Sequence, residues 1–538
     1  MAKSDLVLGI DSSTQSTSAV IMGREDLVPL AEACVRYRDD PRLRSFGLTE
    51  EIPVLPSREP GEADQPAAIF LAALDALFED LPRELLGRLG AVNLSAQQHG
   101  QIWLSERGAE AIHDLRRAGF GSRGRLAERI APGLADGRAP IWMSADTALE
   151  AAELRRAAGG AAAMTELSGS DSPLRFTGAV TLRRARRFPR LYGRTTHIHL
   201  ISSFLAAVLC GDPDTPIDWG GASGTSLMDW SGRKWAPRLL SAVSAGLEGG
   251  VAGLESRLPR LVHPLTIVGG IAAYFSERYG MPGDCAVVAG SGDNPQSKVL
   301  AEGSLLSLGT SFVLMTEGRT PHLCANAMYD GLGRPFLFGC RTNGALVLEA
   351  LRRAHGLARD DFATSDAALE AFPPGSVLRL FQPERESFPA SGPLDIGIRA
   401  DFPGDYAGAV DAALGLMVLA SEPFGSVGAG LTVTGGVASS RVMLRRIATL
   451  WGTRALPVAE AGAAAGAAIA AACALVAERE RGEIARRGRM GATKPGIAIE
   501  PDADLVEACR KPGGYLERLE ALFIEATGTR PAEASASI

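Results

Sequence analysis

The sequence predicts an α/β protein built from more than one domain, and two observations support this prediction. Short apolar runs typical of strands alternate along the chain with stretches of helical periodicity, and turns rich in glycine, serine and threonine separate them. The chain has 538 residues, which is too many for one hydrophobic core. Its hydrophobic content of 46% and charged content of 22% are typical of a soluble globular protein.

Charge and cysteine usage exclude several classes of function. The net charge of −7 argues against nucleic acid as the main partner. No apolar run has the length of a membrane span, and residues 1–11 enter a strand pattern at once, so we expect neither a membrane anchor nor a signal peptide. The seven cysteines form no Cys-X-X-Cys pair, which predicts reduced thiols in the cytoplasm instead of disulfides or a zinc site.

The first element is a β-hairpin, predicted from two apolar runs, residues 6–10 and 19–22, that a hydroxyl-rich turn joins. Asp11 ends the first run, and a carboxylate there could hold Mg²⁺ through water. The turn hydroxyls and amides could cradle a phosphate, although an ordinary polar hairpin is the alternative interpretation. Residues 305–316 have the same form, so we expect a duplicated architecture with one hairpin in each half.

The next elements are a helix and a strand that ends in a polar cluster. Residues 61–89 have helical periodicity, and residues 91–94 read as a strand that delivers the polar residues 95–100. A polar cluster at the carboxyl end of a strand is where α/β folds place ligands. Gln97 and His99 could therefore hydrogen-bond a polyol, whereas a lone histidine is more often structural.

The middle of the chain carries weaker signals. Residues 108–136 are rich in arginine and glycine and predict a surface excursion, and residues 148–163 predict a helix. The basic run 183–187 is typical of a solvated helix face. Residues 216–230 are rich in small side chains and either contact a ligand or turn the chain. We place a domain boundary near residue 264.

The strongest chemical signal follows the apolar run 285–289, which reads as a buried strand. A glycine-rich turn then leads to Asp293 at the mouth of a helix that we expect to run to residue 303, where backbone N–H groups favour anions. A second strand, residues 305–308, breaks at the turn 309–311, which suits a phosphate. Together these features predict a phosphoryl-transfer centre; two ordinary turns are the alternative interpretation.

The C-terminal part repeats the pattern of strand, glycine turn and helix. Residues 431–434 form the predicted strand, and Gly435 and Gly436 let the backbone approach a flat ligand or a phosphate closely. Residues 461–476 predict an Ala/Gly helix, whose small side chains allow close packing or leave room for a nucleotide base. We expect residues 528–538 to be a disordered tail.

Taken together, these stretches resemble the FGGY carbohydrate kinases, and within that family the xylulokinases of the animal type. The resemblance covers residues 6–476, and the order and spacing of its motifs make it specific. The motifs are LSAQQHG (94–100), PIWM (140–143), RFTG (175–178), PIDWGGASGTSLMDW (216–230), GSGDNPQS (290–297), SLGTS (307–311) and TGG (434–436).

The resemblance implies two actin-like (ribonuclease H-like) domains with an interdomain catalytic cleft. Residues 1–264 would form a sugar-binding domain and residues 265–527 a nucleotide-binding domain. The cofactors would be ATP and Mg²⁺, and the reaction would transfer a phosphoryl group to the terminal hydroxyl of a ketopentose, first of all D-xylulose, giving D-xylulose 5-phosphate. The resemblance also allows a homodimer, although the sequence does not fix the oligomeric state.

The resemblance also implies a role for individual residues. Asp293 would be the general base, and Asp11 would organise Mg²⁺. The ketose would be bound by Gln97, His99, Asp293 and Asn294. The nucleotide would be bound by Thr14, Gln15, Gly309, Thr310, Gly435, Gly436 and Ser440.

Three departures from the animal-type pattern concern the sugar. The chain has Ser18 where that pattern has a lysine, Ser144 where it has an aspartate (Asp146 follows two residues later), and Asp171 where it has an arginine. An acid in place of a cation would change which polyol fits. Ribulose, another pentulose, a deoxy sugar or a pentitol is therefore the alternative substrate.

A second class of function is an ATP-switched binding protein, because actin and the seventy-kilodalton heat-shock chaperones share the two-domain nucleotide cleft. The polar cluster at residues 95–100 and the pair Asp293–Asn294 argue against it, since a chaperone needs no sugar-directed base. A catalytically inactive sensor is disfavoured because Asp11, Asp293 and both hairpins are present.

Overall fold

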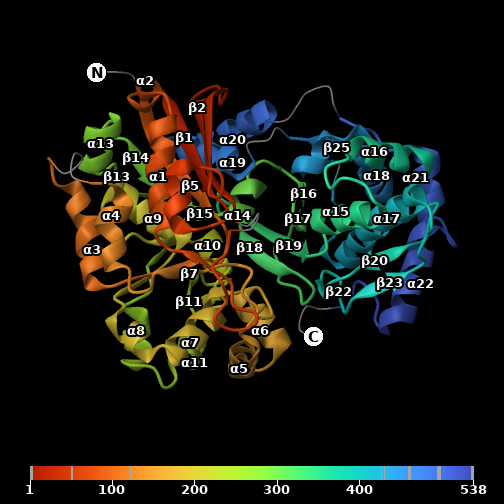
Figure 1. Ribbon diagram of the computed structural model, residues 1–538, viewed down its shortest axis with the longest axis horizontal. Helices are drawn as coiled ribbons and strands as arrows, with labels where there is room; N and C mark the ends of the chain where they lie inside the picture. Colours follow the sequence, from red (N-terminus) through yellow and green to blue (C-terminus); the bar gives the residue numbers. More distant parts are fainter. Residues whose placement is uncertain are drawn as a thin grey trace. The chain divides into compact units, whose positions relative to one another are not determined.

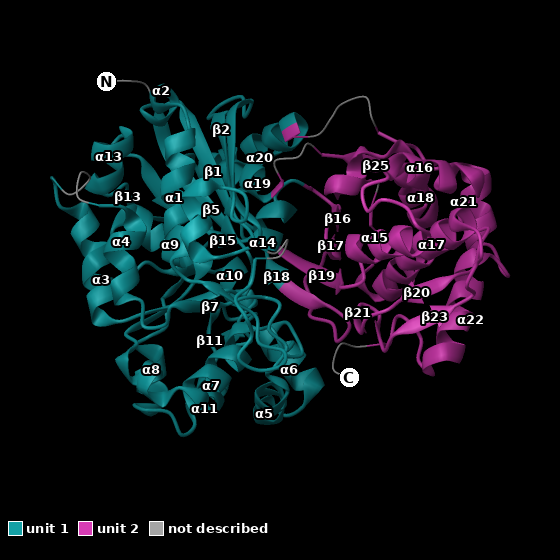
Figure 2. Ribbon diagram, viewed as in Figure 1, with its two compact units in different colours: residues 1–300, 328–334, 463–491 teal, residues 301–327, 335–462, 492–538 magenta. Residues whose placement is uncertain are grey.

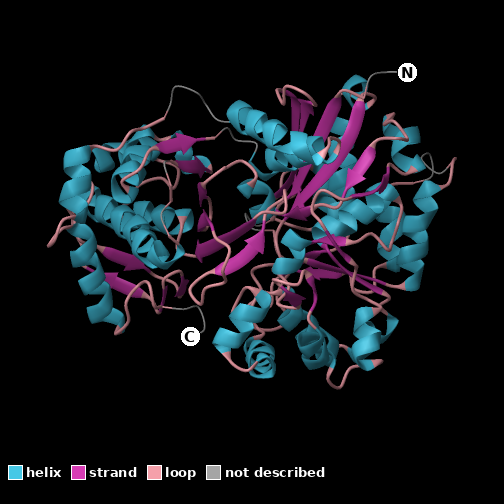
Figure 3. Cartoon of the chain, turned by 180° about the vertical axis from the view of Figure 1, so that it is seen from behind, coloured by secondary structure: helices cyan, strands magenta, loops and turns pink. Residues whose placement is uncertain are grey.

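The computed structural model describes the chain as two compact units, each with a central sheet and flanking helices (Figures 1, 2 and 3). Unit 1 comprises residues 1–300, 328–334 and 463–491, and unit 2 comprises residues 301–327, 335–462 and 492–538. The residues described are 4–49, 53–119, 124–425, 427–428, 430–458, 462–492 and 498–534.

The sheet of unit 1 has seven strands in the order β13-β14-β5-β1-β2-β3, with β15 also paired with β5. Strands β1 and β2 form an antiparallel hairpin, and β1 runs parallel to β5. The predicted first hairpin therefore forms, with its turn at residues 13–15. The strands are β1 Leu6–Ser12, β2 Ser16–Gly23, β3 Pro29–Arg36, β5 Leu89–Ala96, β13 Ile267–Gly270, β14 Ala286–Val288 and β15 Ser291–Gly292.

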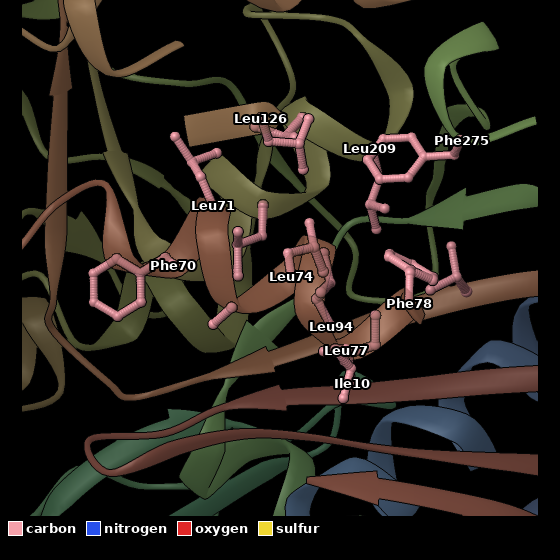
Figure 4. Close-up of a cluster of buried hydrophobic side chains, with 14 of the residues drawn as sticks. Ile10, Phe70, Leu71, Leu74, Leu77, Phe78, Leu94, Leu126, Leu209 and Phe275 are labelled. Atoms are coloured by element: carbon pink, nitrogen blue, oxygen red, sulfur yellow. The ribbon is translucent and has the colours of Figure 1, made fainter. Parts of the chain in front are cut away.

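One face of this sheet carries the main apolar core of unit 1, formed with helices α1 (Ile69–Asp80), α9 (Ile201–Cys210) and α13 (Ala273–Tyr279). Burying a leucine or phenylalanine side chain stabilises the fold by about 1.5–3 kcal/mol, so this cluster fixes the strands that lead to the site. Figure 4 labels its buried members Ile10, Phe70, Leu71, Leu74, Leu77, Phe78, Leu94, Leu126, Leu209 and Phe275.

The predicted surface excursion over residues 108–136 is wrong in part. This stretch folds into α3 (Glu106–His113) and α4 (Leu126–Ile130), joined by residues that include the buried Leu115. Leu115, Leu126 and Ile130 lie in the core cluster, because apolar side chains spaced along short helices outweigh the basic composition. Residues 120–123 lie outside the described part of the chain.

Two further helix predictions need correction. The helix expected over 148–163 is interrupted at Gly159, where α5 (Ala148–Ala158) ends in a left-handed conformation, and α6 (Ala161–Ser168) follows. The basic run lies on α7 (Thr177–Arg187), but it is not wholly solvated. Arg184 is buried, and its guanidinium donates to the Asp136 carboxylate and, at 3.4 Å, to the Asp64 carboxylate.

The predicted Ala/Gly helix, α19 (Gly462–Ala474), packs closely within unit 1. A Cβ at Gly9 of β1 would overlap the Ala464 carbonyl oxygen, and the side-chain amide of Asn93 donates to the Ala467 carbonyl oxygen at 3.2 Å. Because side chains alternate along a strand, Gly9 faces away from the core that Ile10 joins. The small side chains therefore serve close helix–sheet packing here.

The sheet of unit 2 has the order β18-β19-β17-β16-β24-β25. Its β16–β17 pair is an antiparallel hairpin, and β16 runs parallel to β24, as β1 does to β5. The same arrangement thus occurs twice, as the two hairpin patterns predicted. The strands are β16 Ser304–Leu308, β17 Phe312–Glu317, β18 Asn326–Tyr329, β19 Pro335–Arg341, β24 Leu431–Thr434 and β25 Ala455–Pro457.

The interior of unit 2 contains α17 (Phe402–Ser421), a helix long and apolar enough to cross a membrane by length and composition. Most of this helix is buried inside the protein, as expected of a core helix. It packs with α16 (Phe362–Ala371), α18 (Arg441–Trp451) and α22 (Tyr515–Thr527). Among the described residues it is the single candidate span.

The compact units divide the chain after residue 300, whereas the sequence placed the boundary near residue 264. Strands β13 and β14 follow residue 264 and still belong to the first sheet. The predicted assignment of sugar to one part and nucleotide to the other stays a prediction. In the predicted tail, the Ala534 carbonyl oxygen accepts from the Ala390 N–H at 3.4 Å; residues 535–538 lie outside the described part.

Candidate active site

The carboxyl ends of three strands of unit 1 lie side by side and bring the predicted acids together. Parallel pairing sets Asp11 of β1 beside Ser95 of β5, and Ser291 of β15 on the other side of Ser95. The Ser95 hydroxyl donates to the Asp11 carboxylate at 2.6 Å. Asp293 follows β15 directly, as the first residue of α14 (Asp293–Lys298), which is shorter than the helix expected to run to residue 303.

Asp293 is held by backbone amides. Its Oδ1 atom accepts from the N–H of Asn294 at 2.8 Å and from the N–H of Gln98 at 3.3 Å. Burial and the nearby charge of Asp11 raise the pKa of Asp293 to about 7, while the two amides act in the opposite direction. A carboxylate with a pKa near neutrality is well matched to accept a proton from an alcohol during a reaction.

Asp11 offers one carboxylate oxygen toward a cation, because Ser95 takes the other. Burial raises the pKa of Asp11, and the Ser95 hydroxyl opposes this rise. No three His, Cys, Asp or Glu side chains gather into a metal site in the described ranges. Mg²⁺ needs no such cluster, since one or two carboxylates with water and substrate phosphates commonly hold it. Asp11 therefore fits Mg²⁺, and a cation would relieve its repulsion of Asp293.

The buried carboxylate of Asp218 supports the loop that precedes Asp293. Asp218 has an exposed fraction of 0%, and its carboxylate accepts from the Ser291 hydroxyl at 2.7 Å and from the N–H groups of Gly220 and Gly221. Burial raises the pKa of Asp218 to about 7. Within the stretch 216–230, for which the sequence left a ligand contact and a turn of the chain open, Asp218 has a structural role, since it caps the short helix α10 (Trp219–Ser223).

His99 lies in the strained turn after β5, with a backbone φ of 73°. Its ring stacks on Phe176 at 4.3 Å, and Nδ1 lies 2.8 Å from the Gly224 carbonyl oxygen. Burial and the positive charge of Arg175 lower the pKa of His99 to about 3. Because a carbonyl only accepts, Nδ1 carries the proton and donates, which leaves Nε2 of this neutral ring as a hydrogen-bond acceptor.

Gln97 and Thr14, predicted for the sugar and the nucleotide respectively, are hydrogen-bonded to one another. The Thr14 hydroxyl donates to the Gln97 side-chain oxygen at 3.4 Å and accepts from the indole N–H of Trp142 at 2.8 Å. Gln97 is buried, Thr14 and Asn294 are half-buried, and Gln15 is exposed.

The predicted nucleotide residues of unit 2 gather at the carboxyl ends of β16 and β24. Gly309 and Thr310 form the turn after β16, and Gly435 follows β24, with a φ of 98°. A Cβ at Gly435 would overlap the Leu308 carbonyl oxygen, so only glycine fits there. Gly436 is exposed beside it. A phosphate could approach this backbone closely.

Ser440 lies at the start of α18 and caps it. Its hydroxyl accepts from the Met443 N–H at 3.1 Å and donates to the Asp366 carboxylate at 2.7 Å. The hydroxyl of Ser440 is thus used in holding α18 to α16, and the Asp366 carboxylate beside it is an acceptor that the sequence reasoning did not single out.

Each residue that departs from the animal-type pattern has a hydrogen-bond partner or a defined position in the structure. Asp171 pairs with Arg155 at 2.9 Å, and Asp146 pairs with Arg183 at 2.7 Å. The Ser144 hydroxyl donates to the Ala63 carbonyl oxygen at 3.0 Å. Ser18 lies on β2 opposite Asp11.

Besides Asp366, sequence reasoning missed three residues that shape the site: Gln65, Trp142 and Glu386. Trp142 lies inside the PIWM motif, so that motif was the signal that could have found it. Gln65 and Glu386 stand in no motif, and only the folded chain brings Gln65 to the Thr14 carbonyl oxygen and Glu386 to the Thr342 N–H.

The comparisons with known proteins concern the chain as a whole. No family model matches the chain. A xylulose kinase of Schizosaccharomyces pombe is 30% identical over 411 residues, covering 72% of this chain and 71% of that protein. A probable D-xylulose kinase A of Aspergillus fumigatus is 29% identical over 73% of this chain and 67% of its own. Xylulose kinase 2 of Arabidopsis thaliana is 32% identical, but the match spans 53% of its length.

Solved structures show the same fold. A xylulose kinase from Rhodospirillum rubrum has a TM-score of 0.76 at 18% identity, covering 97% of this chain and 98% of its own. A gluconate kinase from Lactobacillus acidophilus, at 16% identity, has the same TM-score and coverage. A Plasmodium falciparum glycerol kinase with ADP has a TM-score of 0.73 at 13% identity, covering 98% and 99%. The predicted α/β fold of two actin-like domains is confirmed, and the fold alone does not discriminate between sugars.

Proposed function

This chain belongs to the FGGY carbohydrate kinases and is xylulose kinase-like, and from that premise we propose that it phosphorylates a ketopentose. The reaction would transfer the γ-phosphoryl group of ATP to the terminal hydroxyl of D-xylulose and give D-xylulose 5-phosphate. The observation that carries the chemistry is the carboxylate of Asp293, which two backbone amides fix at the same sheet edge as Asp11.

In this proposal Asp293 is the general base. Its ionised carboxylate accepts the proton of the terminal hydroxyl while the hydroxyl oxygen forms a bond to the γ-phosphorus. The bond between the γ-phosphorus and the β,γ-bridging oxygen breaks, and ADP leaves with the electron pair. Because phosphoryl transfer requires mainly alignment and charge neutralisation, the fixed orientation of this carboxylate matters as much as its basicity.

The sugar would be oriented by neutral hydrogen-bonding groups. His99 presents Nε2 as an acceptor, since Nδ1 donates to Gly224. The half-buried Asn294, next to the base, would donate and accept through its amide. Gln97 would contribute the donor and acceptor capacity that its internal hydrogen bonds leave.

The nucleotide would be bound by both glycine- and hydroxyl-rich turns. Thr14 and Gln15 belong to the first turn, and Gly309 and Thr310 to the second, while Gly435, Gly436 and Ser440 would line the adenine and ribose pocket. Asp11 would hold Mg²⁺, which when bound supplies positive charge to the phosphates. The division of residues 1–264 for sugar and 265–527 for nucleotide belongs to this proposal.

The second candidate keeps the enzyme class and changes the sugar to ribulose, another pentulose or a pentitol. The carboxylate of Asp171 favours it, because one of its oxygens is buried without a hydrogen-bond partner in the structure.

The enzyme would act in the cytoplasm on small molecules, without nucleic acid or membrane. The homodimer allowed by the resemblance is tested by measuring the mass of the protein in solution.

The test is ATP consumption by the purified protein with Mg²⁺ across a panel of ketoses, aldoses and polyols. Highest turnover on D-xylulose supports the first candidate, and highest turnover on another polyol supports the second. No turnover on any sugar, with ATP still bound, contradicts the proposal.

The assignment of the base is tested separately. Asp293→Asn should keep nucleotide binding and lower turnover by about 10²–10⁴-fold, the usual contribution of a general base. Asp284→Asn, an exposed aspartate in the loop before β14, is the matched control and should leave turnover unchanged. Unchanged turnover in Asp293→Asn would remove this residue from its role.

A further inference from the structure

A closed ring of hydrogen bonds joins a predicted sugar residue to a predicted phosphate turn in unit 1. The Thr14 hydroxyl donates to the Gln97 side-chain oxygen at 3.4 Å, and the Gln97 amide donates to the Gln65 side-chain oxygen at 2.7 Å. The Gln65 amide then donates to the Thr14 carbonyl oxygen at 2.7 Å and closes the ring. None of these bonds is local in sequence.

Gln65 is the residue of the ring that no function explains. It lies on β4 (Asp64–Pro66) with an exposed fraction of 0%, so neither sugar nor nucleotide can reach it. Its second amide proton is donated to the Pro53 carbonyl oxygen at 2.8 Å. Both protons and the oxygen are thus used, and the side chain has one orientation in which all partners are satisfied.

The direction of the bonds in the ring is fixed by chemistry. The indole of Trp142 can only donate, so the Thr14 hydroxyl accepts from it at 2.8 Å. The hydroxyl proton of Thr14 therefore lies toward Gln97, whose oxygen accepts it. Gln97 in turn has one side-chain proton committed to Gln65 and one remaining.

We propose that Gln65 is a positioning residue that couples sugar binding at Gln97 to the order of the phosphate turn at Thr14. This inference rests on the proposed function, which places sugar at Gln97 and nucleotide phosphate at residues 13–15. A sugar hydroxyl that binds Gln97 fixes its amide; the fixed amide holds Gln65, and Gln65 holds the backbone carbonyl of the turn. Sugar should then tighten nucleotide binding and, by thermodynamic reciprocity, nucleotide should tighten sugar binding.

The chain offers a matched control in Gln101. Gln101 also has an exposed fraction of 0% and three side-chain hydrogen bonds, to the Thr177 carbonyl oxygen, the Trp103 indole and the Thr181 hydroxyl. None of these partners belongs to the ring; only Thr177 touches a proposed site residue, since its hydroxyl donates to the His99 carbonyl oxygen at 3.4 Å. Gln65→Met and Gln101→Met therefore remove equal numbers of buried hydrogen bonds, while only the first opens the ring.

The experiment measures the affinity for a non-hydrolysable ATP analogue by calorimetry, with and without the sugar that the wild type phosphorylates. The coupling factor is the ratio of the two dissociation constants. We expect a wild-type factor of about 5–150, in the usual range of such couplings. Gln65→Met should bring the factor to about 1, and Gln101→Met should keep the wild-type factor even if its melting temperature falls equally. Equal factors in both variants overturn the inference.

Gln65→Glu keeps the shape of the side chain and provides a second test if Gln65→Met fails to fold. A protonated glutamic acid donates to the Thr14 carbonyl oxygen and accepts from Gln97, so the ring closes; the ionised form cannot donate, so the ring opens. Burial raises the pKa of a glutamic acid above its ordinary value of about 4.3, so this pKa is first measured by titration of the variant. Relative to the wild type at each pH, its coupling should be retained below that pKa and lost above it. A ratio that does not change across that pKa overturns the inference. A wild type without turnover overturns the proposed function, and this inference with it.

Discussion

The two hairpins of the chain share their strand arrangement but differ in what holds their turns. In unit 1, the turn at residues 13–15 has backbone bonds, such as that from the Tyr37 N–H to the Gln15 carbonyl oxygen at 3.0 Å, and side-chain amides hold it in addition, through the ring of Thr14, Gln97 and Gln65. In unit 2, backbone holds the turn at residues 309–311. The Gly309 carbonyl oxygen accepts from the Ala345 N–H at 3.2 Å, and a Cβ at Gly344 would lie 2.5 Å from the Thr310 carbonyl oxygen.

The backbone support of the second turn depends on one buried carboxylate. Glu386, with an exposed fraction of 2%, accepts from the N–H groups of Thr342 and Asn343 at 2.7 and 2.9 Å and from the Asn343 amide at 2.8 Å. It also accepts from the Ser387 N–H at 2.7 Å. These bonds fix the segment that delivers Gly344 to the turn.

The strand arrangement is therefore repeated in the two units, whereas the side chains that support the two turns are different. Gln97 keeps one side-chain proton that the ring does not use, so a ligand that binds it can act on the first turn. Several backbone N–H groups donate to the Glu386 carboxylate at once, and the buried Arg341 guanidinium lies 3.8 Å from it, so the second turn is suited to stay fixed. We therefore expect ligand-dependent order in the first turn and a rigid second turn.

The largest effect on the turnover rate should come from lowering the pH, which protonates Asp293 in unit 1. Asp293 has a raised pKa, so it is ionised and competent above about pH 7 and becomes protonated, and unable to accept a proton, below it. Mg²⁺ at Asp11 would move this limit to lower pH by offsetting one cause of the shift. The turnover rate should fall about tenfold per pH unit on the acid side, which is about ten- to a hundredfold at pH 5.

The measurement is the turnover rate at saturating sugar and ATP from pH 5 to pH 9. The same profile of Asp293→Asn should lack the acid limb, because its residual activity no longer needs this ionisation. An acid limb in the Michaelis constant for ATP, with none in turnover, would contradict the assignment.

The next largest effect should come from removing the Glu386 carboxylate, which supports the turn of the second hairpin. Glu386→Gln replaces one accepting oxygen with an NH₂ group that faces N–H donors, at a cost of about 1–3 kcal/mol for each unsatisfied buried group. We expect the Michaelis constant for ATP to rise about tenfold or more, with that for the sugar unchanged. Glu384→Gln, an exposed neighbour, is the control for steady-state kinetics. Equal effects on both Michaelis constants would contradict a role confined to this turn.

A smaller effect should follow from adding one methyl group beside the second turn. Gly344→Ala places its Cβ 2.5 Å from the Thr310 carbonyl oxygen, so the turn must shift. We expect ATP affinity to fall about fivefold to tenfold, or about 1–1.4 kcal/mol, as calorimetry would measure. Gly392→Ala in the same unit meets no atom within 4 Å and should leave affinity unchanged. Equal losses in both variants would show that the second turn is not rigid.

The smallest effect should come from trimming the outer support of the first turn. Trp142→Phe removes the indole N–H that donates to Thr14. It leaves the hydrogen bonds among Thr14, Gln97 and Gln65 in place. We expect a loss of about 0.5–1.5 kcal/mol in stability, the usual net contribution of one hydrogen bond, and turnover within about threefold of the wild type. Thermal unfolding and steady-state rates test this. A loss as large as that of Gln65→Met would mean that Trp142 is part of the ring's function.

Much of the fold could be predicted because strand and turn signals are local. The apolar runs at β1, β16 and β24 are each followed by small or hydroxyl-bearing residues, and all three form strands. Parallel pairing then places the ends of β1 and β5 together, so Asp11 and the cluster after Ser95 become neighbours.

The rest depended on contacts between distant residues, which a single sequence does not contain. Arg184 looked solvated because its partners, Asp64 and Asp136, are far away in the chain. Gln65 and Glu386 carry no local signal, since each acts through side-chain bonds to residues that only the fold brings near. The roles of individual site residues stay predictions until the variants are measured.

The packing of α19 on β1 has a consequence for the order in which the protein can be made. Gly9 and Asn93 emerge from the ribosome early, whereas Ala464 and Ala467, which cover them, are synthesised after most of unit 2. One face of the sheet of unit 1 therefore stays uncovered by α19 while hundreds of residues are synthesised. A chain released before residue 462 would present that bare face to other molecules, and we expect such fragments to aggregate where the full chain does not.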